Sequence, residues 1–157
     1  MTRVVLVPGV LALLPEYAGI EDPVVELRAA AQAAVARLGR DVTVLADAQG
    51  ARVAAYLLDV TDREGDERSY LVVANGSAKR TEKAPGHLDE RAEAFDAALG
   101  ESLRAGRPEV DAKLARELWA SVDALSEFPR LSSDFRAQVD YDDAPYGVQY
   151  WVMRWTG

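Results

Sequence analysis

The 157-residue sequence contains no cysteine and one histidine, His87. Without cysteine, disulfides, zinc–thiolate sites and cysteine nucleophiles are excluded, and the reducing cytoplasm is the simplest expected location. A facial triad for iron(II) needs two histidines and a carboxylate, and a catalytic zinc without cysteine usually needs two imidazoles. One chain therefore builds neither site, and we expect no metal and no cofactor. A carboxylate-only magnesium or calcium site, or a site shared across a dimer, stays open.

Positive charge and long apolar runs are also scarce. The 18 Lys and Arg residues face 26 Asp and Glu residues, so the formal net charge is −8 and binding to a phosphate backbone is disfavoured. The apolar N-terminal stretch is interrupted by Pro8-Gly9 and is shorter than the roughly 20 residues of a membrane span. It also lacks the basic region of a signal peptide. We therefore predict neither a nucleic-acid nor a membrane partner.

The residues that are present suit one domain over 1–157, because 49% of them are hydrophobic. Short apolar runs at Arg3–Val7, Val42–Leu45 and Tyr70–Ala74 are typical of buried strands. Between the first two runs, Asp22-Pro23 indicates a helix start, with Asp as the N-cap and Pro in the first turn. This strand–helix–strand order predicts parallel strands with a right-handed crossover.

The stretch before Tyr70 is harder to assign. Ala54–Val60 is interpreted as a third strand that forms a hairpin with Ser69–Ala74, with the charged run 62–68 as the bend between them. Asp47–Gly50 is interpreted as a turn or loop. A hairpin at this point would make the sheet mixed.

Two helices and a second hairpin are predicted in the remaining chain. One helix begins near Asp89, which caps it, with Leu88 as a hydrophobic staple, and another runs from Pro108 to about Leu125. Alternation over 135–141 and an aromatic run over 148–155 then predict an antiparallel hairpin at the sheet edge. The expected fold class is therefore α/β, a single-domain mixed sheet flanked by helices with a C-terminal antiparallel hairpin.

The loop from Asn75 to Asp89 is the first candidate site, because ligands of open α/β sheets collect at the carboxyl ends of strands. Gly76, Ser77, Lys79 and Arg80 provide turn N–H groups and two cations, a pattern that favours a small anionic ligand. The alternative interpretation is a solvated loop in which Lys79 or Arg80 pairs with an aspartate.

Three side chains are weak catalytic candidates. Ser77 could act as a nucleophile with His87 as its base, although no Gly-x-Ser-x-Gly elbow surrounds it, and a turn serine is the simpler interpretation. His87 fits a partly exposed loop residue as well as a cleft acid or base. Asp142 and Asp143 fit paired acid/base carboxylates and turn-forming residues about equally.

The segment Ser77–Arg91, running on to Phe95-Asp96, resembles a block of the subunit-B-like class III extradiol ring-cleavage dioxygenase superfamily, which includes the Memo-like proteins. The turn within Tyr141–Val148 is similar to the C-terminal signature of that superfamily. Pro8 after the opening strand, followed by Leu14-Pro15-Glu16, is similar to its N-terminal block. The likeness is to short actinobacterial members of unknown role.

The resemblance implies an α/β fold in which a mixed sheet lies between helices. In active members, two histidines and a carboxylate hold iron(II) at the strand ends, and a further histidine serves as acid/base while a catechol ring opens. This sequence departs from the pattern at the ligands. Ala78 stands where the family's ligand histidine follows the serine, and the Pro8-Gly9 turn holds no histidine. Ring-cleavage activity is therefore not expected.

The resemblance and the missing ligands together predict a non-catalytic domain with a degenerate active site that binds a ligand or a partner. The alternative is a metal-independent enzyme, or one with carboxylate-bound magnesium or calcium, that reuses the cleft with Ser77, Lys79, His87 and Asp142. A deep pocket that gathers these four side chains would favour the enzyme, and a filled region would favour the binding domain. The oligomeric state stays open.

Overall fold

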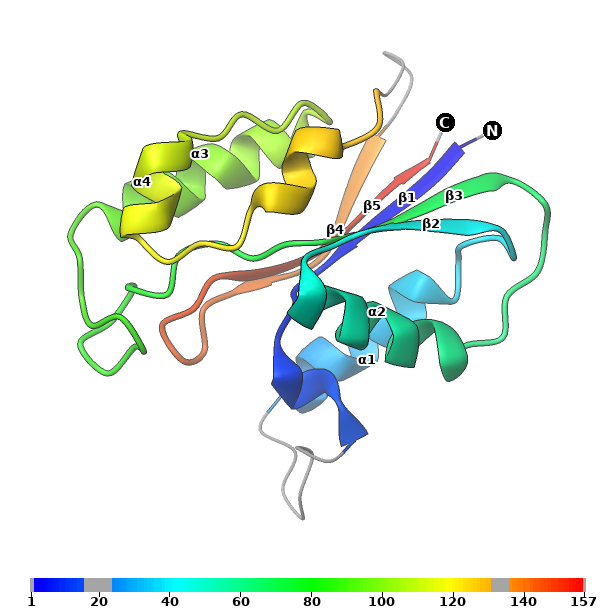
Figure 1. Ribbon diagram of the computed structural model, residues 1–157, viewed down its shortest axis with the longest axis horizontal. Helices are drawn as coiled ribbons and strands as arrows, with labels where there is room; N and C mark the ends of the chain where they lie inside the picture. The colour runs from blue at the N-terminus through cyan, green and yellow to red at the C-terminus, as the bar shows by residue number, and fades with distance from the viewer. Residues whose placement is uncertain (1, 16–23, 131–135, 157) are drawn as a thin grey trace.

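The computed structural model describes residues 2–15, 24–130 and 136–156. A five-stranded sheet has the order β2-β3-β1-β5-β4 (Figure 1). Its strands are β1 (Thr2–Val7), β2 (Val42–Leu45), β3 (Arg68–Val73), β4 (Arg136–Asp143) and β5 (Tyr150–Thr156). Strands β1, β2 and β3 run parallel, whereas β5 pairs antiparallel with both β1 and β4. The predicted α/β class, with a mixed sheet and a C-terminal antiparallel hairpin, is confirmed.

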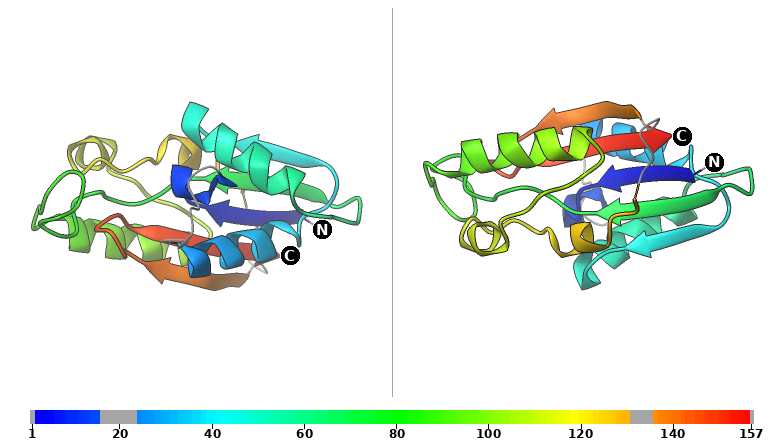
Figure 2. Two further views of the ribbon diagram at one scale, coloured as in Figure 1. Left: turned by 90° about the horizontal axis from the view of Figure 1, so that it is seen from below. Right: turned by 90° about the horizontal axis from the view of Figure 1, so that it is seen from above.

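Helices cover both faces of the sheet, so the fold has three layers (Figure 2). One face carries the short helix η1 (Leu11–Leu13) with α1 (Val25–Val35) and α2 (Ala48–Asp59); the other carries α3 (Ala92–Arg104), α4 (Ala112–Glu117) and η3 (Asp123–Glu127). Successive side chains of a strand point to opposite faces. Accordingly, Val5 and Val7 of β1 pack toward α1 and α2, while Val4 and Leu6 pack toward α3 and α4. Within the described ranges, no helix combines the length and the apolar content needed to span a membrane.

The strand predicted at Ala54–Val60 is wrong, because this segment belongs to helix α2. Asp47, predicted to lie in a turn, is the N-cap, and its Oδ1 accepts a hydrogen bond from the Gly50 N–H at 2.6 Å. The buried residues Val53, Ala54 and Leu57 follow helical spacing. The charged run 62–68 consequently leads from α2 into β3, which lies between β2 and β1 instead of forming a hairpin.

The helical region after the central loop also differs from the prediction. Helix α3 begins at Ala92, while Asp89 caps the preceding turn by accepting the Arg91 N–H at 2.9 Å. Leu88 is 51% exposed and therefore makes no hydrophobic staple. The long helix predicted from Pro108 is instead α4 and η3, separated by a break at Trp119, whose φ is +60°. The predicted helix start at Asp22-Pro23 lies outside the described residues.

Candidate functional site

Neighbouring segments pack closely on one another at the carboxyl end of the parallel strands. A Cβ at Gly9 would lie 3.1 Å from Val73 Cγ1 and 3.4 Å from the Gly50 Cα, so the chain after β1 packs closely on the first turn of α2. The Gln49 side chain donates to the Gly9 carbonyl at 2.6 Å. Ser121 closes the same region by donating its hydroxyl to Asp47 Oδ2 at 3.0 Å.

The loop after β3 is tied down through its own backbone. Five of its N–H groups already donate to protein acceptors: Asn75 to Ser121 O, Gly76 to Gln149 O, Ser77 to Asp96 Oδ1, Ala78 to Leu118 O and Arg80 to Gly147 O. These bonds measure 2.8–3.0 Å. The N–H cradle expected for an anion at Gly76 and Ser77 therefore has no donor left at either residue. The loop instead anchors the hairpin and the segment after α4.

Ser77 and Asp96 form a buried pair. Their exposed fractions are 0% and 3%, and the Ser77 hydroxyl donates to Asp96 Oδ2 at 2.7 Å while the Ser77 N–H donates to Oδ1 at 2.8 Å. Burial raises the pKa of Asp96 above its usual range, although the hydrogen bonds from Ser77 and the charge of Arg80 act in the opposite direction. The geometry assigns Ser77 a structural role, since its hydroxyl proton is held by a buried carboxyl.

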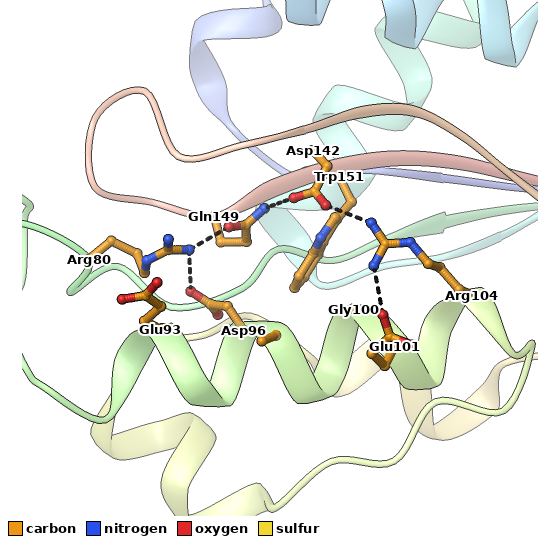
Figure 3. Close-up of a pocket in the computed structure, with 10 residues that line it drawn as sticks. Arg80, Glu93, Asp96, Gly100, Glu101, Arg104, Asp142, Gln149 and Trp151 are labelled. Atoms are coloured by element: carbon orange, nitrogen blue, oxygen red, sulfur yellow. Dashed lines mark hydrogen bonds and ion pairs between the residues drawn. The ribbon is translucent and has the colours of Figure 1, made fainter.

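A chain of polar side chains continues outward from this pair (Figure 3). Arg80 Nη1 donates to Gln149 Oε1 at 2.7 Å and lies 3.5 Å from Asp96 Oδ2. Gln149 Nε2 in turn donates to Asp142 Oδ1 at 2.7 Å, and Arg104 Nη2 donates to Asp142 Oδ2 at 2.8 Å. The network links α3 to the β4–β5 hairpin and holds each of these polar groups in a fixed position.

This network surrounds a cavity of about 280 Å³ between α3 and the β4–β5 hairpin. Its lining consists of Arg80, Glu93, Asp96, Ala97, Gly100, Glu101, Arg104, Asp142, Gln149 and Trp151. This volume lies just below the roughly 300–1,000 Å³ of most ligand pockets, so the space suits only a small ligand. Two of the residues singled out from the sequence, Arg80 and Asp142, line it.

The other predicted site residues lie elsewhere. His87 is exposed at a φ of +60°, and its Nδ1 lies 3.3 Å from the Glu82 carbonyl. Lys79 Nζ sits 5.3 Å from the centre of the Trp119 ring, a cation–π contact. Asp143 forms a turn contact through Oδ1, which accepts the Ala144 N–H at 2.8 Å. The structure therefore does not gather Ser77, Lys79, His87 and Asp142 in one pocket.

Replacing His87 with alanine is expected to change the free energy of unfolding by less than about 0.5 kcal/mol, the usual range for exposed side chains. The imidazole is exposed, its contact with the Glu82 carbonyl is long at 3.3 Å, and alanine meets the same positive φ. Urea denaturation of the two proteins would measure the difference. A loss several times larger would show that the histidine has a packed or bonded role.

Sequence reasoning missed Asp96, Gly100, Arg104, Gln149 and Trp151. A signal existed for Asp96, which occupies a buried position of the apolar face of α3, four residues after Ala92 and three before Leu99. A carboxylate at such a position needs a partner. The other four carry no comparable pattern, because the cavity depends on how the hairpin docks on α3.

Among the described residues, no three His, Asp or Glu side chains gather closely enough to hold a metal ion. The comparisons with known proteins add no family assignment. No protein-family model, no curated protein and no solved structure matches this chain.

Proposed function

We propose that the protein is a non-catalytic binding domain with the fold of the class III extradiol dioxygenase superfamily and without its iron site. Its ligand binds in the cavity between α3 and the β4–β5 hairpin. The resemblance rests on the sequence blocks described above, with Ala78 in the place of a ligand histidine. The working environment we propose is the cytoplasm, consistent with a chain that has no cysteine.

The observation that carries the proposal is the fixed polar network around an open cavity. Polar groups that neighbours already hold in place bind a ligand at a lower ordering cost. Arg80 and Arg104 are each anchored by an acidic or amide side chain, and their side chains remain 25% and 38% exposed. They can therefore still contact a small molecule that enters the cavity.

The enzymatic alternative receives no support from the geometry. It requires Ser77, Lys79, His87 and Asp142 to converge on one substrate, because a base must lie within hydrogen-bond reach of its proton. The Ser77 hydroxyl donates to Asp96, and Lys79 packs over Trp119. Asp142 alone of the four lines the cavity.

The location of the site can be tested by ligand-observed NMR with a panel of small polar compounds: amino acids, carboxylates, phosphates, amines, sugars and nucleosides. We expect hits that are lost in Gly100→Leu, because a leucine side chain at Gly100 would occupy the cavity. Ala98→Leu is the matched control. It also places a leucine on α3, but on the face toward α4, where Ala98 lines a separate groove.

Hits that Ala98→Leu retains and Gly100→Leu loses would support the proposed site. Hits that bind both variants equally would place binding elsewhere. If no compound binds at millimolar concentration, the cavity is not a small-molecule site and the proposal fails.

A further inference from the structure

The indole N–H of Trp151 is a donor at the wall of the cavity, beside Gly100. Trp151 is 2% exposed and lines the cavity, yet its Nε1 has no acceptor among the described residues. By contrast, the indole N–H of Trp155 donates to the Leu103 carbonyl at 3.0 Å. The Trp151 N–H is therefore available to an acceptor that enters the cavity.

Gly100 leaves the approach to this donor open. A Cβ at Gly100 would lie 3.5 Å from Trp151 Nε1 and 3.7 Å from Arg104 Nη1, both ordinary contact distances. Sterics therefore do not demand glycine here, although glycine inside a helix costs about 1 kcal/mol relative to alanine. What the glycine provides is space at the point that both donors face. An oxygen placed over Gly100 would meet two N–H groups.

Arg104 makes a charged oxygen the best occupant of that point. Its Nη2 is held by Asp142 at 2.8 Å, whereas the contact of Nη1 with Glu101 Oε1 is long at 3.4 Å. Glu101 is 79% exposed, so an incoming oxygen can replace it at Nη1 at little cost. Guanidinium groups favour carboxylates in this arrangement, and an indole N–H can donate to the same group.

The net charge of the cavity lining disfavours a ligand that carries only negative charge. Its lining holds two arginines and four carboxylates, a formal net charge of −2. Glu93, at the end of the cavity near Arg80, has no hydrogen bond or ion pair with a described residue and can accept a cation. It lies seven residues before Gly100 on α3, which corresponds to about 10 Å along the helix axis. Ala97 and Trp151 also line the cavity and contribute apolar surface to it.

Resting on the proposed function, we propose that this cavity binds an extended zwitterion, a carboxylate and an amine joined by a short carbon chain. The carboxylate accepts hydrogen bonds from Trp151 Nε1 and Arg104 over Gly100. The ammonium group pairs with Glu93, and the carbon chain lies along Ala97 and the Trp151 ring. ω-Amino acids have this chemistry, and so does free lysine through its carboxylate and its side-chain amine.

Calorimetric titration of the full chain with 6-aminohexanoate, hexanoate and hexylamine tests the class of ligand. These three compounds have the same six-carbon chain and differ only in which ends of it carry a charge. We expect 6-aminohexanoate to bind roughly tenfold or more tightly than either analogue, since each end adds a charge-assisted hydrogen bond. Glu93→Gln should remove the advantage of 6-aminohexanoate over hexanoate. Gly100→Ala should weaken 6-aminohexanoate, because its methyl group covers the two donors.

The outcomes separate the ligand class from the site. If hexanoate or hexylamine binds as tightly as 6-aminohexanoate, or if Glu93→Gln keeps the full preference, the zwitterion is the wrong class although the cavity still binds. If none of the three binds while other panel compounds are lost in Gly100→Leu, the class is wrong and the proposed function stands. If the panel also yields nothing, both proposals fall.

Discussion

Replacement of Asp96 with alanine is expected to lower the free energy of unfolding by about 2–6 kcal/mol, because two buried donors of Ser77 lose their acceptor at roughly 1–3 kcal/mol each. The change leaves the Ser77 N–H and hydroxyl buried without their acceptor and takes the carboxylate away from Arg80. The loss affects Arg80 less, since its guanidinium keeps the 2.7 Å hydrogen bond to Gln149 and its side chain is 25% exposed. Ser77, at 0% exposure, has no access to solvent. Urea denaturation at neutral pH measures the loss.

Asp96→Asn is the matched control, because the amide retains an acceptor for the Ser77 N–H and removes the titratable proton. It should cost less than the alanine change. A loss below about 1 kcal/mol for Asp96→Ala, the level of an ordinary exposed position, would contradict the central role of this carboxyl.

The raised pKa of Asp96 makes the difference in stability between the wild type and Asp96→Asn depend on pH. The pKa of the folded carboxyl lies above its ordinary value of 3.8, mainly through burial, so the folded state holds the proton to higher pH than the unfolded state. That contribution to stability is complete below pH 3.8 and is lost as pH rises through the folded pKa. The stability of the wild type relative to Asp96→Asn should therefore fall as pH rises above 3.8.

Gly76→Ala is expected to destabilise the protein by about 1–3 kcal/mol, the cost of overpacking a tight interior. A Cβ at Gly76 would lie 2.6 Å from Asp96 Oδ1 and 2.7 Å from the Gln149 Cβ. Both side chains belong to the polar network, and neither contact can be relieved without moving the hairpin or the buried carboxyl. The role of this glycine is thus to let the loop, α3 and β5 approach one another.

Gly100→Ala is the control for Gly76→Ala, because it adds the same methyl group where the neighbouring atoms are 3.5 Å or more away. It should leave stability unchanged or raise it by up to about 1 kcal/mol through better helix propensity. Thermal denaturation of both variants gives the comparison. Equal stability of Gly76→Ala and the wild type would mean that the loop is not packed as tightly as described.

The sequence predicted the fold where the pattern was local. The parallel strands at the start and the aromatic hairpin at the end are short runs whose period or composition identifies them. Ala54–Val60 was misassigned because an alanine-rich apolar run fits a buried strand and a helix alike. Asp47 before this run is an N-cap residue, and its hydrogen bond to the Gly50 N–H starts the helix. This residue was the sequence signal that favoured a helix over a strand.

The candidate site was predictable only in part. Arg80 and Asp142 were singled out, and both line the cavity, while the alternative of Arg80 pairing with an aspartate matches its 3.5 Å contact with Asp96. The expected anion cradle at Gly76 and Ser77 depended on free backbone donors, and distant segments of the chain occupy them. Long-range pairing of this kind leaves no trace in local spacing.

The three tryptophans allow one spectrum to test the central claim, that ligands bind between α3 and the β4–β5 hairpin. Trp151 lines the cavity, Trp119 marks the loop at Lys79, and the Trp155 indole is bonded to Leu103 in the core. Indole ¹H–¹⁵N resonances, assigned with Trp151→Phe and Trp119→Phe, are recorded with and without the compound that binds best. Our account predicts that the Trp151 signal shifts and that the other two stay in place. A shift of Trp119 with Trp151 unchanged would contradict it and place the ligand at the loop.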